Sequence, residues 1–179
     1  MSEINQLILF AKYNQLMNER QYEAATHLSN ADLCEDKGAF FKSVIGTLNH
    51  ILVGDIIWLK RFSEHPSSSE ALSYISEQEK PKSLDTILFM DIDGLKNERE
   101  KIDKIIIKWI EQLSEEDLSN CISYTNMAGN LFSQRFLSLI NHLFLHQVHH
   151  RGQVTTLFSQ SGIDFGETDL IEIIDHCSS

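Results

Sequence analysis

The sequence of 179 residues has few cysteines, only two prolines and no long apolar run. Cys34, Cys121 and Cys177 are odd in number and widely spaced, which argues against a disulfide framework and favours a reducing compartment. No apolar stretch approaches the ~20 residues of a membrane-spanning helix, and the N-terminus lacks a signal-peptide pattern. We therefore expect a soluble cytoplasmic protein that has no membrane partner.

Positive charge is also scarce, because 26 Asp and Glu residues face only 15 Lys and Arg residues. The resulting net charge of -11 repels a phosphate backbone, and no basic stripe interrupts the pattern. We therefore expect no nucleic-acid partner. The hydrophobic content of 42% is enough for one core in a chain of this length, so residues 1–179 are predicted to form a single domain.

Pro66 and Pro81 both fall in one polar region, and the proline-free segments on either side carry apolar residues at helical spacing. This pattern predicts four long helices, at about 2–27, 39–62, 91–113 and 133–160. The expected architecture is therefore an all-α four-helix bundle with a long crossover between helices 2 and 3.

Shorter features are predicted between and after the long helices. A short helical piece is expected at 71–75, Ser114 is a candidate start of another short helix, and 122–131 forms a small hairpin or an irregular loop. Gly162 is the expected residue after the last helix, and a short docked tail follows it.

The strongest chemical signal is a group of four histidines within nine residues of the last predicted helix, His142, His146, His149 and His150. Helix positions four apart differ by only ~40° in direction and about 6 Å in rise. Either His142 with His146 or His146 with His150 can therefore share one ion. His149 points roughly 60° away from His146, on the side opposite to His150.

A third ligand has to come from another helix, and His50 in the second long helix is the best donor. The remaining histidines fall at a helix end, in the crossover or in the tail: His27, His65 and His176. Three imidazoles from two helices leave a coordination position open, as in catalytic metal sites. A zincin is excluded because Gln147 stands where its Glu base belongs, and no histidine has the Glu-x-x-His spacing of di-iron bundles.

The segment 142–153 (HLFLHQVHHRGQ) resembles the signature of the DinB family, within the wider DinB/YfiT-like superfamily of metalloenzymes. The similarity extends in order along nearly the whole chain, through 13–14, 18–20, 46–50, Asp55, Trp58, 124–129, 162–164 and 168–170. Asn126 departs from the pattern, because a positively charged residue is expected there.

The resemblance implies an up-down-down-up four-helix bundle that is usually a homodimer. It also implies a divalent metal ion, zinc or nickel with manganese or iron as alternatives, held by residues matching His50, His146 and His150. The resemblance thus favours the pair His146 and His150 over the pair His142 and His146, a choice that helix geometry leaves open. Relatives in the superfamily include transferases and isomerases that use a low-molecular-weight thiol, and the family name records induction by DNA damage.

Three functions compete at this stage. The first is a metal-dependent enzyme, a thiol-dependent transferase or hydrolase acting on a small molecule, with catalytic residues unassigned and the roles of Tyr124, Arg151 and Gln153 open. The alternative is a non-enzymatic metal-binding stress-response protein. The third is a helical interaction module that holds no metal.

Overall fold

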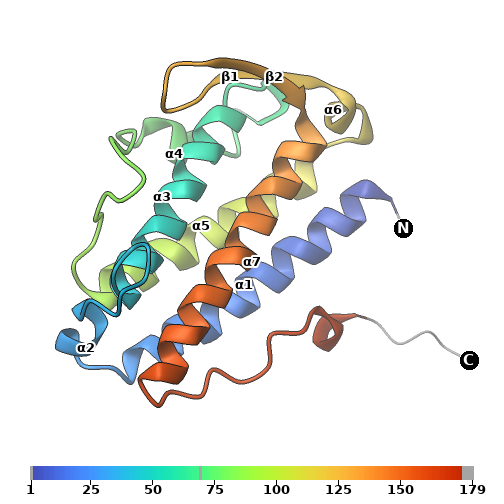
Figure 1. Cartoon of the computed structure of the whole chain (residues 1–179). Helices are drawn as coiled ribbons and strands as arrows, with labels where there is room; N and C mark the ends of the chain where they lie inside the picture. The colour runs from blue at the N-terminus through green and yellow to red at the C-terminus, as the bar shows by residue number, and fades with distance from the viewer. Residues whose placement is uncertain (1, 69, 175–179) are drawn as a thin grey trace, which may run out of the picture.

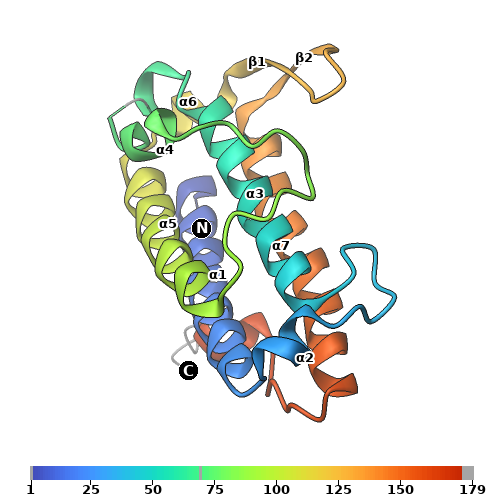
Figure 2. The ribbon, with the colours of Figure 1, turned by 90° about the vertical axis from the view of Figure 1, so that its left-hand side faces the viewer.

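The computed structural model describes residues 2–68 and 70–174, and most of them are helical. Four long helices dominate the fold (Figure 1): α1 (Glu3–Thr26), α3 (Val44–Phe62), α5 (Ile92–Gln112) and α7 (Phe136–Gln160). Helix α1 packs against α5 and α7, and α3 packs against α7 and α5. Figure 2 shows α5 and α1 on one side, with α3 and α7 on the other. The prediction of a mainly helical chain is confirmed.

Shorter elements connect the long helices: α2 (Asn30–Cys34), the 3-10 helix η1 (Pro66–Ser68), α4 (Ser73–Glu77) and α6 (Glu115–Ser119). A second 3-10 helix, η2 (Leu170–Ile173), lies in the tail after α7. Strands β1 (Cys121–Thr125) and β2 (Leu131–Arg135) pair antiparallel, so of the two forms predicted for 122–131, a hairpin or an irregular loop, the structure has the hairpin, and the fold is mostly helical rather than all-α. The hairpin lies across the ends of α3 and α7 that are drawn uppermost in Figure 1.

Side-chain caps explain where several helices begin. Ser43 accepts a hydrogen bond from Gly46 N, and Asp91 accepts one from Gly94 N, so each supplies an acceptor to a free helix N–H. Ser114 and Asp117 form a capping box, which confirms the helix start predicted there. Gly162 has a φ of 75° and ends α7, as predicted for the residue after that helix.

Two predicted helix starts were wrong. The second long helix begins at Val44 rather than near 39, because the chain turns tightly from Ala39 to Lys42, which has a φ of 69°. Phe40 therefore lies outside the helix and is 87% exposed. The last long helix begins at Phe136 rather than near 133, because Ser133 pairs with a residue of β1 in the hairpin ladder.

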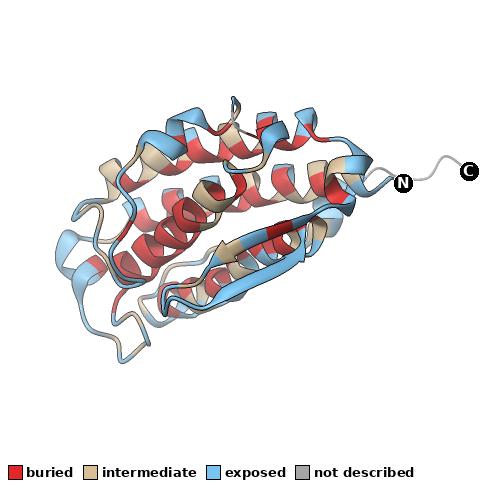
Figure 3. Ribbon diagram, turned by 90° about the horizontal axis from the view of Figure 1, so that it is seen from above, coloured by how far each residue is buried: buried red, intermediate tan, exposed pale blue. Residues whose placement is uncertain are grey.

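A large apolar core fills the space between the four helices, and the buried faces in Figure 3 point inward. Trp109 stacks on Phe62 at 5.4 Å between ring centroids, lies 6.0 Å from Phe136, and donates its indole N–H to Ser68 Oγ at 2.9 Å. None of these contacts involves a histidine of the predicted site. We therefore expect the core to pack without a metal ion.

The tail after Gly162 runs back along α1, where Glu172 forms an ion pair with Arg20 and Thr168 O accepts a hydrogen bond from Tyr13. The predicted docked tail is thus confirmed as far as residue 174, whereas His176 and Cys177 lie outside the described residues. Among the helices of the described chain, none is both long and apolar enough to cross a membrane.

Candidate metal centre

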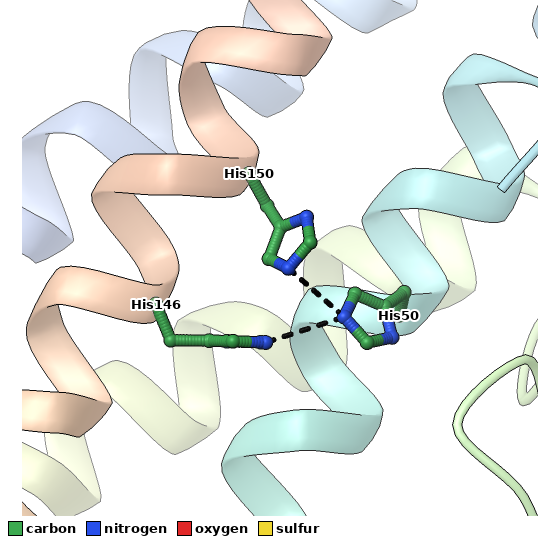
Figure 4. Close-up of side chains that lie close together, drawn as sticks. All are labelled: His50, His146 and His150. Carbon is green, nitrogen blue, oxygen red and sulfur yellow. Dashed lines mark hydrogen bonds between the residues drawn. The ribbon is translucent and has the colours of Figure 1, made fainter. Parts of the chain in front are cut away.

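Three imidazoles meet between α3 and α7 (Figure 4). His50 Nε2 lies 3.2 Å from His146 Nε2 and 3.0 Å from His150 Nε2. The three candidate ligand atoms all lie within 4.8 Å of one another. The structure therefore brings together the one histidine of the second long helix and the pair spaced four apart on the last.

Hydrogen bonds at the far side of two rings fix where their protons sit. His50 Nδ1 lies 2.8 Å from the Leu84 carbonyl oxygen, and His150 Nδ1 lies 2.8 Å from Gln153 Oε1. Both oxygens only accept, so each Nδ1 carries the proton and each Nε2 presents a lone pair. Two lone pairs that face each other at 3.0 Å repel unless a cation lies between them.

Burial keeps these rings neutral. Desolvation lowers the pKa of His50, and it lowers the pKa of His146 to about 3, with the neighbouring His150 as the next cause. Desolvation also lowers the pKa of His150 to about 4, against the opposing effect of the hydrogen bond that His150 Nδ1 donates to Gln153 Oε1. Neutral imidazole is the form that binds a metal ion, so at pH 7 all three rings are ready to act as ligands.

The other two histidines of the last helix stay outside the cluster. The His142 ring packs edge-on against Trp58 at 5.0 Å, with its centroid 6.1 Å from that of His146. His149 is exposed, and its Nε2 lies 3.3 Å from Gln153 Nε2. The structure thus distinguishes between the two pairs that helical spacing left open.

Two residues that the sequence did not single out shape the space around the cluster. Phe41 stacks on the His50 ring at 3.7 Å between centroids and lies edge-on to His150 at 5.6 Å, so it covers one side. Gly54 leaves room for His146, because a Cβ at this position would lie 2.7 Å from His146 Cε1. Gly54 lies on α3 and His146 lies on α7, so the need for a glycine here arises from the packing of two helices and no sequence motif indicates it.

A buried polar network beside the cluster ties the four long helices together. Gln147 Nε2 donates to Asp55 Oδ2 at 2.6 Å, and Asn18 Nδ2 donates to both carboxylate oxygens of Asp103 at 3.1 Å. Arg99 forms ion pairs with Asp55 and with Asp103. Burial raises the pKa of Asp55 to about 6, although the Arg99 charge opposes it. Gln147 is the position where a zincin would carry its base, and here it is part of the core.

The three residues whose roles were open take different places. Arg151 is buried and donates to Asn14 Oδ1 at 2.6 Å, which supports a structural role. Gln153 holds the proton-bearing nitrogen of His150, as residues behind metal ligands commonly do. Tyr124 lies in β1, 5.1 Å from the Trp58 ring and away from the cluster.

Two comparisons with known proteins point to the same family. The model of the DinB family matches residues 1–176. The protein DinB of Bacillus subtilis (strain 168) is 22% identical over 163 residues, which cover 88% of this chain and 87% of that protein.

Proposed function

This chain belongs to the DinB family, and we propose that it binds one divalent metal ion through the Nε2 atoms of His50, His146 and His150. The observation that carries the proposal is the convergence of three neutral imidazoles, two of which have their Nδ1 protons held by Leu84 and Gln153. A donor set of three imidazoles suits zinc, nickel or iron, and the family resemblance puts zinc or nickel first, with manganese or iron as alternatives.

We further propose that the protein is an enzyme acting on a small molecule, as a thiol-dependent transferase or a hydrolase. Three protein ligands leave a position open, where the metal would act as a Lewis acid or lower the pKa of a bound water or thiol toward about 7. Phe41 shields His50 and His150 from solvent, and Gln153 orients His150. The choice of an enzyme over a non-enzymatic metal-binding stress protein rests on this open position; the nearest cavity is lined by His142, one helical turn from His146, and by none of the three proposed ligands.

The same family resemblance supports two statements about assembly. We propose that α1, α3, α5 and α7 form an up-down-down-up bundle and that two copies associate as a homodimer. Leu145 and Val148 on α7 are 66% and 46% exposed, beside an apolar groove of about 530 Å³ that Phe10 and Phe144 help to line. A second copy of this chain that covered this groove would remove these apolar side chains from water.

Metal analysis of purified variants tests the ligand set. The wild-type protein is expected to bind one equivalent of zinc or nickel, and His50→Ala, His146→Ala and His150→Ala should each lose most of it. His149→Ala is the matched control, because it removes a neighbouring imidazole that points to solvent. Loss of metal in His149→Ala together with retention in His150→Ala would overturn the assignment.

A further inference from the structure

A cavity of about 490 Å³ lies along the contact between α3 and α7, under the hairpin. It is lined by one residue of α3, three of α7 and three of the hairpin: Trp58, Tyr124, Gln134, Arg135, Ser138, Leu139 and His142. The ring of Trp58 contacts His142, which in turn neighbours His146. His142, Ser138 and Arg135 precede His146 by four, eight and eleven residues, so they lie about 6, 12 and 16 Å from it along the helix axis.

The charge of this cavity differs from that of the rest of the protein. The chain carries 26 acidic residues, yet no carboxylate lines the cavity. Arg135 lines it, and within the described residues its side chain forms no ion pair or hydrogen bond. In so acidic a protein, an arginine without an anionic partner at the wall of a cavity is available to a ligand.

A second guanidinium lies behind the aromatic wall. Arg61 sits over the rings of Trp58 and Tyr124, with its Cζ 4.4 and 4.8 Å from their centroids. Its Nη2 donates to Thr125 O at 3.2 Å, while its buried Nε has no partner in the described chain. The positive charge of Arg61 is therefore held in place and adds to that of Arg135, and the two aromatic rings give the cavity an apolar wall.

We propose, building on the metal site above, that this cavity binds the carboxylate end of an elongated small substrate whose other end reaches the metal ion. Arg135 would donate charge-assisted hydrogen bonds to the carboxylate. The apolar middle of the molecule would lie against Trp58 and Leu139. The substrate class is thus an anionic molecule with a metal-binding group, such as a thiol, separated from its carboxylate by several methylenes.

Calorimetric titration of the zinc-loaded protein with two matched probes tests this inference. The probes are 8-mercaptooctanoate and 8-mercaptooctan-1-ol, which share the thiol and the chain but differ in the carboxylate. The wild-type protein should bind the carboxylate about tenfold more tightly, which corresponds to one charge-assisted hydrogen bond at a partly exposed site. Arg135→Gln should remove this preference while leaving the affinity for the alcohol unchanged.

Lys104→Gln is the matched control, because Lys104 lines a separate groove with residues of α1 and α5 and its loss changes the net charge equally. It should retain the full preference for the carboxylate. Equal affinity for the two probes in the wild type, or a preference that survives Arg135→Gln, would overturn the substrate class while the metal site stands. Absence of bound zinc before any probe is added would instead overturn the proposed metal site.

Discussion

Replacing Gly54 by alanine separates the stability of the helix from the geometry of the metal site. A Cβ at this position would lie 2.7 Å from His146 Cε1, whereas ordinary contacts begin at 3.4 Å. The His146 ring must therefore withdraw by about 0.3 Å to reach the shortest contact that real Cβ atoms make and by about 0.7 Å to reach an ordinary one, more than the ~0.2 Å by which ligand distances in metal sites vary. Because disturbing the support of one ligand commonly weakens metal binding 10–100-fold, we expect a loss of at least about tenfold in affinity.

The same substitution should not destabilise the metal-free protein. Alanine in place of glycine inside a helix favours folding by roughly 0.5–1 kcal/mol, and the half-buried His146 side chain can rotate away when no ion holds it. Gly152→Ala on α7 is the control, because a Cβ there meets no atom within 4 Å. It should give the same gain in stability with unchanged metal affinity.

Competition with a chelator of known affinity measures metal binding, and urea unfolding of the metal-free variants measures stability. Weaker metal binding with unchanged or increased stability in Gly54→Ala is the expected combination. Wild-type metal affinity in Gly54→Ala would refute the reasoning, because it would mean that His146 does not need the space that this glycine leaves.

Three further predictions concern the fold, its pH dependence and its charge. Removal of metal should leave the helical circular dichroism intact but lower the melting temperature, because an ion at a thousandfold excess over Kd adds about 4 kcal/mol; loss of helix on chelation would contradict an independent core. The raised pKa of Asp55, about 6 in the folded protein against 3.8, means that the folded state binds this proton more tightly. Unfolding free energy should therefore rise as pH falls from 7 to 4, by up to about 3 kcal/mol relative to Asp55→Asn in urea titrations, and an identical pH dependence of the two proteins would contradict this. At a net charge of -11 we expect no binding to duplex DNA in a filter assay at physiological salt, and salt-sensitive micromolar binding would be the opposite result.

The long helices could be predicted because their signal is local. Proline-free segments with apolar residues at helical spacing locate α1, α3, α5 and α7, and the Ser114 cap locates α6. The two wrong starts arose where a non-helical segment carries residues that also suit a helix. Phe40 continues the apolar spacing of α3 although it lies in an exposed turn, and Ser133 resembles a cap although it belongs to β2.

Only the part of the candidate site that depends on local sequence could be predicted from residue spacing. His146 and His150 are related by the geometry of one helix, so their spacing alone permits a shared ion. Helical spacing leaves the choice between this pair and the one containing His142 open. The family resemblance favours His146 with His150, and the packing of α3 against α7 brings this pair to His50. Leu84 contributes through its backbone carbonyl, and no side-chain pattern can indicate such a contact.

The register of the two helices is where the fold and the site meet. Gln147 follows His146 directly, and its amide donates to Asp55 on α3, five residues after His50. Successive helix residues differ by ~100° in direction, so the rotation of α7 that buries Gln147 against Asp55 also determines where His146 points. Arg99 of α5 forms an ion pair with Asp55, so the position of Asp55, and with it the rotation of α7, also depends on a third helix. Gln147, at the position that lacks the zincin base, thus fixes the rotation of α7 that turns His146 toward His50.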